Sequence, residues 1–292
     1  MGVKNLSKLI RKHAPGAVRT TTLSDYSGKR LAFDTPIFMY KYASVMPGNV
    51  VQGFKDLHAL LVQHDIVPIF VFDGKTSEAK TGEMNKRRAT KKRARAQCAE
   101  AEAHLRNVKQ KTTCGNFAEL VEAQEKYEKA SKRVQGVPTS TDYTEVIEWM
   151  KSCNITYMFA PYDAEKLITE LVTTNKADMC VTEDFDVLPY YARFDDISNA
   201  RMLTGMGKLE MVEYNLEQVL KGFNIDQRQL VDVCILSGCD FSEKIHGIAA
   251  VRALQLVRAH GTIEEILRVL DRRKYTVPEV FEYKKARNEF LL

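Results

Sequence analysis

The chain has 292 residues, of which 45% are hydrophobic and 28% are charged, and its formal net charge is +5. This composition is typical of a globular protein with one large or two small domains, and it excludes a disordered or fibrous chain. No apolar run approaches the roughly 20 residues that a membrane-spanning helix needs. The six cysteines form no CxxC pair, which favours reduced core thiols and an intracellular protein over a disulfide framework.

Hydrophobic patterning predicts alternating helices and strands in the first third of the chain. The elements expected there are, in chain order, a helix over 3–13, a strand over 31–34, a helix over about 37–63 with an interruption near Pro47 and Gly48, and a strand over 67–72. A different segment follows from 77 to 136. It is rich in Lys, Arg, Glu, Ala and Gln and has no strand pattern, which predicts two polar helices joined by a turn near 112–116 and standing away from the core.

The alternation resumes after this segment. The elements expected there are a helix over 142–152, a strand over 155–160, a helix over 163–175, a strand over 178–181, further strands within 201–213, and mainly helices from 215 onward. Together the two alternating regions predict an α/β fold with a mostly parallel, twisted central sheet and helices on both faces.

A strongly basic run lies within the polar segment, because seven of the ten residues from 86 to 95 are Lys or Arg. On a helix, Lys80, Arg87, Lys91 and Arg95 fall near one face. Phosphate is the natural counter-charge of such a face, and binding would depend steeply on salt. A solvated helix face or a nuclear-import signal would also explain the run. Because the run follows the turn at Asp73 and Gly74, nucleic acid is favoured as its ligand.

Carboxylates follow five hydrophobic runs of the chain. They are Asp34, Asp73, Asp163, Glu165, Asp184, Asp186 and Asp240. Parallel strands bring their carboxyl ends to one edge of a sheet, where ligands bind. Each acid alone could be a helix N-cap or a turn former. The same pattern after five hydrophobic runs favours one shared pocket. Seven anions need counter-charge there, and all-oxygen ligands favour Mg²⁺ or Mn²⁺. The pattern predicts a two-metal site of the kind used in phosphodiester hydrolysis.

These residues resemble the flap endonuclease branch of the XPG-type structure-specific 5′ nucleases, over nearly the whole chain. The matching segments are residues 1–6, 33–40, 71–75, 80–87, 160–165, 182–186 and 238–241, in that order. The resemblance implies the PIN-like 5′ nuclease fold with a helical arch and a helix–two-turn–helix element. The implied organisation is a single nuclease domain over 1–265, followed by a short C-terminal extension over 266–292. Within the domain, the implied regions are an N-terminal region over 1–105, an internal region over 140–265, the arch over 77–136 and the helix–two-turn–helix over 228–260.

The implied function is metal-dependent cleavage of DNA 5′ flaps near single-strand/duplex junctions, with related 5′–3′ exonuclease activity, in DNA replication or repair. The seven carboxylates would hold two Mg²⁺ ions, with Mn²⁺ as a substitute, and Asp184 is also expected to be catalytic. Lys80 and Arg87 match positions that neutralise charge on the scissile phosphate. Tyr40 matches a position that stacks on a base, although the residue alone favours a core or helix-surface aromatic. Gly2 would permit close backbone approach.

The implied helix–two-turn–helix would grip duplex phosphates through backbone N–H groups. The positions expected to bind DNA are Gly2, Tyr40, Lys80, Arg87, Lys91, Lys92, Arg95, Lys244, Gly247 and Arg252. The chain departs from the family pattern at Ala249 and Ala250, where Gly and Pro are common, and at Lys244, where a small hydroxyl residue is usual. These departures argue against the potassium ion that the family often holds at this turn. The Lys244 ammonium is expected to replace it.

Two more residues depart from the family pattern. Asp163 replaces the usual Glu, so it is expected to reach a metal through water, and Asn5 replaces a usual Gly. We expect a monomer without a sliding-clamp-binding tail or membrane contact, in the nucleus or at a cytoplasmic site of DNA replication such as a viral factory. The alternatives are a non-catalytic DNA-junction binding protein, against which the retained acidic set argues, and an RNA-directed nuclease on the same scaffold.

Overall fold

A computed structural model describes residues 3, 5–75, 81–111, 117–134 and 136–292, without the side chains of 81–88, 91, 111 and 132–134. The chain forms two compact units. Unit 1 consists of Met1–Ile37, Leu57–Lys80 and Cys153–Leu292, and unit 2 of Phe38–Asp56 and Thr81–Ser152. No helix within the described residues has both the length and the apolar character needed to cross a membrane.

Unit 1 is built around a seven-stranded sheet with the order β1-β7-β6-β5-β2-β3-β4. The strands are β1 (Val18–Thr21), β2 (Arg30–Asp34), β3 (Val67–Phe72), β4 (Tyr157–Phe159), β5 (Met179–Val181), β6 (Arg201–Thr204) and β7 (Met211–Asn215). The pairs β2–β3, β2–β5, β3–β4 and β5–β6 are parallel, whereas β7 pairs antiparallel with β6 and β1. The expected α/β class with a mostly parallel sheet is confirmed.

The central strands are buried because they consist of apolar residues on both faces. Leu31, Phe33, Phe70 and Val71 have no exposed surface, as expected for strands covered on both sides. The sequence pattern does not predict strand β1, since Val-Arg-Thr-Thr carries too few apolar residues to show a strand pattern. It is a strand because it pairs with β7 at the edge of the sheet.

In chain order, a helix follows most of the strands. The helices of unit 1 are α1 (Leu6–His13), α7 (Ala164–Thr173), α8 (Val187–Tyr190), α9 (Leu216–Phe223), α10 (Gln227–Ser237), α11 (Ala250–His260), α12 (Ile263–Val269), α13 (Tyr283–Leu291) and three short 3₁₀ helices, Pro15–Ala17, Leu23–Tyr26 and Tyr191–Arg193. The first helix begins at Leu6 instead of residue 3, because Asn5 adopts a left-handed φ of 64°. Asn tolerates this conformation better than most residues, which explains how it can replace a glycine here.

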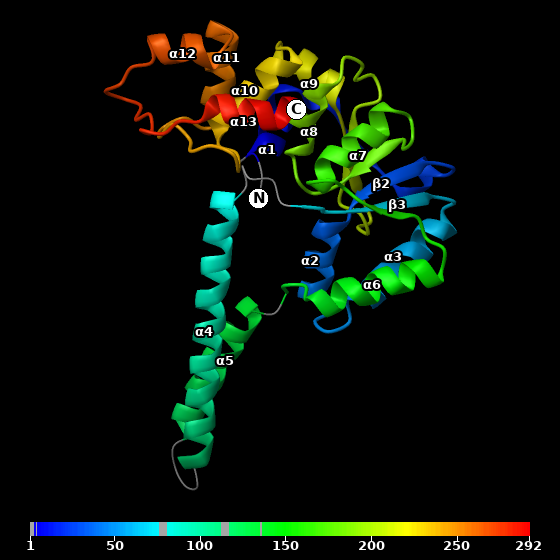
Figure 1. Cartoon of the computed structure of the whole chain (residues 1–292), viewed down its shortest axis with the longest axis vertical. Coiled ribbons are helices and arrows are strands. Elements are labelled where there is room, and N and C mark those ends of the chain that lie inside the picture. Colours follow the sequence, from blue (N-terminus) through cyan, green and yellow to red (C-terminus); the bar gives the residue numbers. More distant parts are fainter. Residues whose placement is uncertain (1–2, 4, 76–80, 112–116, 135) are drawn as a thin grey trace. The chain divides into compact units, whose positions relative to one another are not determined.

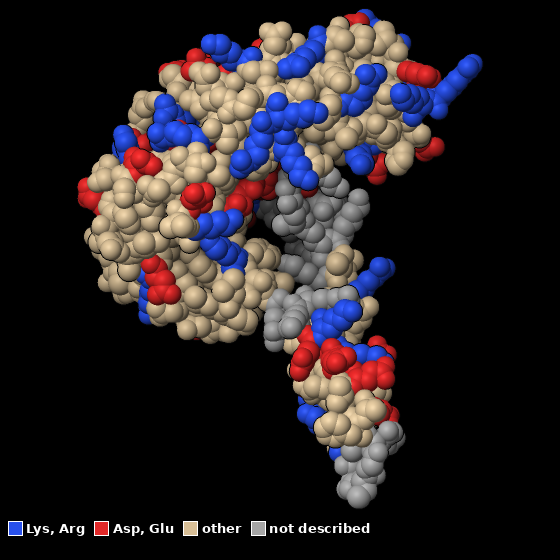
Figure 2. Space-filling view, turned by 180° about the vertical axis from the view of Figure 1, so that it is seen from behind, with Lys and Arg blue, Asp and Glu red and all other residues tan. Residues whose placement is uncertain are grey.

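Unit 2 contains the long polar helices predicted from composition. Its helices are α4 (Thr81–Lys111), α5 (Phe117–Val134) and α6 (Ser140–Ser152), while α2 (Thr35–Val45) and α3 (Val50–Gln63) have residues in both units. Helices α4 and α5 lie side by side (Figure 1) around the small apolar cluster of Leu105, Val108 and Ala123. The face of these helices seen in Figure 2 carries charges of both signs. The turn expected near 112–116 lies outside the described residues.

The segment expected to form a helix–two-turn–helix consists of α10, residues 238–249 and α11. Gly247 in the connection has a φ of 88°, which favours glycine. The terminal helix α13 packs on α10, and the Arg287 guanidinium binds Asp232 at 2.8 Å and Glu264 at 2.8 Å. The side chain of Phe290 is fully buried. The last 27 residues therefore belong to unit 1 and contribute to its core.

Candidate metal and active site

The site begins where β3 ends, because Gly74 lets two chain segments approach very closely. The Gly74 amide donates to the Tyr162 carbonyl at 2.7 Å, and the Lys75 amide donates to the Pro161 carbonyl at 3.2 Å. A Cβ at position 74 would lie 1.9 Å from the Ala160 carbonyl oxygen. Only glycine fits this contact. The contact brings the end of β3 alongside the loop that leads into α7.

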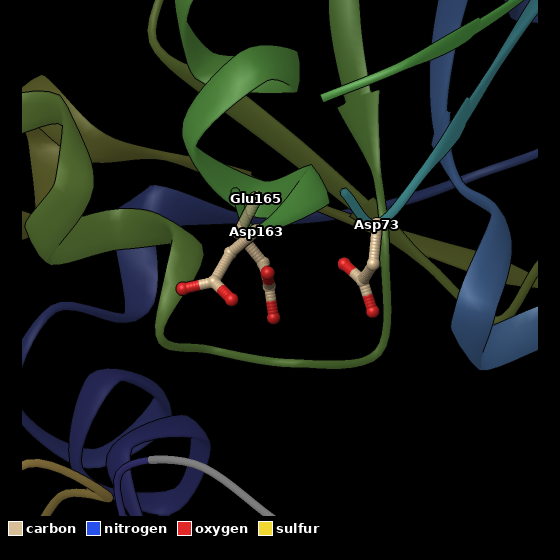
Figure 3. Close-up of side chains that lie close together, drawn as sticks. All are labelled: Asp73, Asp163 and Glu165. Carbon is tan, nitrogen blue, oxygen red and sulfur yellow. The ribbon is translucent and has the colours of Figure 1, made fainter. Parts of the chain in front are cut away.

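Three carboxylates meet at this contact. Figure 3 shows that the side chains of Asp73, Asp163 and Glu165 face the same space. One ligand oxygen from each lies within 4.8 Å of the others. The amide of Ala164, at the start of α7, donates to Asp73 Oδ1 at 2.9 Å, which fixes one oxygen of that carboxylate. Three converging oxygen ligands suit a hard divalent cation.

The N-cap interpretation fails for two of the acids. Asp163 stands at the N-cap position of α7 and Asp186 at that of α8, yet neither carboxylate makes a side-chain cap hydrogen bond. Both side chains are buried, with 7% and 6% of their surface exposed. A capping role therefore does not explain these two residues.

Three further acids are positioned by hydrogen bonds at the ends of β2 and β5. The Thr182 hydroxyl donates to Asp34 Oδ2 at 2.7 Å, and the Asp184 amide donates to the same hydroxyl at 3.0 Å. The Asp186 amide donates to Asp184 Oδ1 at 3.0 Å, and the amide of Val3 donates to Asp186 Oδ1. The chain thus fixes the orientation of each of these carboxylates before any ligand binds.

The pKa shifts at the site reflect the charges of neighbouring acids. Burial raises the pKa of Asp34 well above its ordinary value, and the charges of Glu165, Asp73 and Asp184 raise it further, against the opposing bond from Thr182. Burial likewise raises the pKa of Asp186, followed by the charge of Asp184, with smaller contributions from Asp240 and Glu165. The structure thus groups Asp73, Asp163 and Glu165 in one cluster, and the pKa shifts of Asp34 and Asp186 respond to the charges of Glu165 and Asp184.

Comparison with known proteins supports the sequence resemblance. Residues 1–94 match the XPG N-terminal domain and residues 154–240 match the XPG I-region. The chain is 33% identical to flap endonuclease 1 of Salmo salar and to that of Homo sapiens, with 100% of this chain and 75% of each relative covered. This chain belongs to the flap endonuclease branch of the XPG family.

Solved structures show the same fold. The catalytic core of Rad2 in complex with a DNA substrate matches with a TM-score of 0.65 at 20% identity, covering 99% of this chain and 78% of that one. Flap endonuclease-1 from Methanococcus jannaschii matches with a TM-score of 0.64 at 20% identity, covering 99% and 84%. The α/β architecture of this XPG-family chain is therefore that of known nuclease cores.

The structure describes only some of the predicted DNA-binding residues. Gly2 and Lys80 lie outside the described residues, as do the side chains of Arg87 and Lys91. Lys92 and Arg95 are exposed on α4. Tyr40, on α2, has 40% of its surface exposed.

The predicted residues of the helix–two-turn–helix all lie in unit 1. Lys244 and Gly247 are exposed in the connection between α10 and α11. Arg252, on α11, donates to the Tyr275 hydroxyl at 3.1 Å and to Gln255 Oε1 at 3.3 Å. Its guanidinium therefore already has protein partners.

Sequence reasoning does not identify two residues that shape the acidic site. Thr182 links two strands by bonding Asp34 and the Asp184 amide. A threonine two positions before an Asp is the only signal for it, and that signal is weak. Gly74 belongs to one of the matching family segments, but no sequence signal indicates that a Cβ there would collide with another segment.

Proposed function

We propose that this chain is a divalent-metal-dependent nuclease that cuts the 5′ flap of branched DNA near the junction of single strand and duplex. The observation that carries the proposal is the cluster of Asp73, Asp163 and Glu165 at the carboxyl ends of β3 and β4; the charge effects on Asp34 and Asp186 support adding Asp34, Asp184, Asp186 and Asp240 to it. The relatives named flap endonuclease 1, which the whole chain matches, support the substrate class. Release of nucleotides from 5′ ends is proposed as a related activity, in DNA replication or repair.

The donor set of the site fits Mg²⁺, with Mn²⁺ as a substitute. The ligand atoms of Asp73, Asp163 and Glu165 lie within 4.8 Å of one another, and all are carboxylate oxygens. Asp163 presents an oxygen to this cluster although its side chain is one methylene shorter than the usual Glu. The raised pKa values of Asp34 and Asp186 support this assignment, because a nearby cation would favour the ionised form of each carboxyl.

Two divalent ions, when bound, would activate a water and stabilise the leaving 3′ oxygen. Asp73, Asp163 and Glu165 are the residues that would hold one of them. Asp34, Asp184, Asp186 and Asp240 complete the proposed set, and hydrogen bonds connect Asp184 to Thr182 and to Asp186. Backbone amides bond the carboxylates of Asp73, Asp184 and Asp186, and the Thr182 hydroxyl bonds that of Asp34. These bonds reduce the reorganisation needed on metal binding.

Residues outside the carboxylate cluster are proposed to bind DNA. Lys80 and Arg87 supply positive charge to the scissile phosphate, and Lys92 and Arg95 bind phosphates from the exposed face of α4. The exposed ring of Tyr40 stacks on a base.

In the helix–two-turn–helix, we propose that the Lys244 ammonium takes the place of a potassium ion. Its side chain folds over Gly238, so that a Cβ there would lie 3.4 Å from Lys244 Cδ. A potassium titration at fixed ionic strength tests this substitution. Strong activation by potassium over sodium would contradict it.

The decisive experiment uses a 5′-labelled flap on nicked duplex DNA, incubated with Mg²⁺ and separately with EDTA. Release of the whole flap as one fragment in Mg²⁺ alone is expected. Asp184→Ala should abolish cleavage and leave junction binding measurable. Tight binding without cleavage in Mg²⁺ or Mn²⁺ would refute the nuclease and favour a junction-binding protein. A matched RNA flap shows whether RNA is also cut.

A further inference from the structure

A tyrosine beside the acidic cluster carries a buried hydroxyl with no hydrogen-bond partner. Tyr190 is the last residue of α8, four positions after Asp186, and none of its surface is exposed. Among the residues that the structure describes, its hydroxyl oxygen finds no donor or acceptor. Buried hydroxyls are normally satisfied by protein or by ordered water, because leaving one unpaired costs free energy. An unpaired hydroxyl at this position therefore indicates a missing partner.

The ring of Tyr190 is held firmly from several sides. It packs on the ring of Phe290 with centroids 5.2 Å apart. The Lys166 ammonium lies 5.8 Å and the Arg193 guanidinium 5.9 Å from the ring centroid. Arg193 also donates to the Lys166 carbonyl at 2.7 Å, while the Lys166 ammonium pairs with Glu289 at 3.5 Å. A ring fixed in this way presents its hydroxyl in one direction, which is what the positioning of a ligand requires.

The charges that act on this hydroxyl are those of the proposed metal site. After burial, the negative charge of Glu165 contributes most to raising the pKa of Tyr190, followed by those of Asp163, Asp186 and Glu289. The hydroxyl therefore keeps its proton and can donate it. The Lys166 ammonium, from the residue after Glu165, lies 5.8 Å from the ring centroid, which places the ring near the first turn of α7. The two cations that touch the ring lie over its face, and a cation cannot accept a hydrogen bond from the hydroxyl.

We propose that Tyr190 is a positioning residue, whose hydroxyl donates through one ordered water to the carboxylates of Glu165 and Asp163 and so orients their other oxygens toward the metal. A bridging water fits because no described protein acceptor lies within direct hydrogen-bonding distance. Partners of this kind that orient metal ligands contribute strongly to metal affinity. This inference rests on the proposed function only in that Glu165 and Asp163 hold a divalent ion.

Tyr190→Phe tests the inference because it removes one oxygen and keeps the ring. Mn²⁺ binding to the whole chain is measured by calorimetry, without DNA. The Kd for Mn²⁺ is expected to rise by about 10-fold, and the Mg²⁺ concentration for half-maximal flap cleavage should rise with it. The melting temperature in EDTA should not fall, since the hydroxyl has no described protein partner to lose.

Tyr191→Phe is the matched control. Tyr191 is equally buried, but its hydroxyl contacts Cys180 Sγ at 3.0 Å and the Arg201 carbonyl at 3.4 Å. This variant should lower the melting temperature and leave the Kd for Mn²⁺ unchanged. An unchanged Kd in Tyr190→Phe, or the same rise in both variants, would overturn the inference.

The same measurements separate this inference from the proposed function. A wild-type chain that binds Mn²⁺ but cuts no flap would refute the nuclease, while a rise in Kd for Tyr190→Phe would still support the positioning role. A wild-type chain that binds no Mn²⁺ would overturn both.

Discussion

Gly74→Ala is the substitution that most directly tests how the acidic site is assembled. The new methyl carbon would lie 1.9 Å from the Ala160 carbonyl oxygen, 2.8 Å from the Pro161 oxygen and 2.9 Å from the Ala160 carbonyl carbon. All three atoms belong to the backbone, so no side chain can rotate away. The end of β3 and the loop before α7 must therefore move apart.

The size of this movement follows from the contact distances. Ordinary contacts of a Cβ begin near 3.4 Å, so the segments must separate by about 1.5 Å. Asp73 lies on one segment, and Asp163 and Glu165 follow the other, so the 4.8 Å cluster opens by a similar amount. A misplacement of about 1 Å at a reacting centre can cost on the order of 100-fold in rate. Overpacking of this kind also costs about 1–3 kcal/mol of folding free energy.

Flap cleavage under single-turnover conditions and thermal unfolding together measure these effects. Gly74→Ala is expected to cut about 100-fold more slowly at a given Mg²⁺ concentration while remaining folded. Gly16→Ala is the matched control, because a Cβ at Gly16 meets nothing within 4 Å. Its rate should equal that of the wild type. Wild-type cleavage by Gly74→Ala would refute the argument that this close approach sets the geometry of the carboxylates.

Three other perturbations test separate elements of the proposal. Lys80→Ala should slow the chemical step by about 100-fold or more, the loss typical of one charge-stabilising donor; a change in DNA affinity alone would show that Lys80 only tethers phosphate. Reversing the charges of Lys92 and Arg95 to Glu should reduce the slope of log affinity against log salt by about 0.9 for each lost phosphate contact, and an unchanged slope would return these residues to a solvated helix face. Asp186→Asn should stabilise the chain in EDTA as pH rises above the ordinary Asp value of 3.8, because the raised pKa of Asp186 makes its ionisation in the folded state unfavourable; a melting-temperature difference from wild type that does not grow with pH would contradict this.

Local sequence determined the order of the elements and the places where the acids occur. Strand β3 begins and ends where its apolar run does, at Val67 and Phe72, because a strand whose last five residues are buried must be apolar on both faces. The break between α2 and α3 falls at Pro47 and Gly48, since proline and glycine interrupt helices. The carboxyl ends of parallel strands share one edge of a sheet, so the positions of Asp73, Asp163 and Glu165 after β3 and β4 were enough to predict that these three acids meet.

Only the tertiary structure decided the features that depend on contacts between distant segments. Strand β1 exists because β7 pairs with it, and nothing in its four residues shows this. The hydroxyl of Thr182 bonds Asp34 across 148 positions of the chain. Gly74 meets Ala160 only once both segments are folded, and the Tyr190 ring meets Phe290 of α13 across 100 positions of the chain. A sequence records which groups can donate, accept or ionise. Burial and distance depend on the fold, and they decide which carboxylates raise one another's pKa.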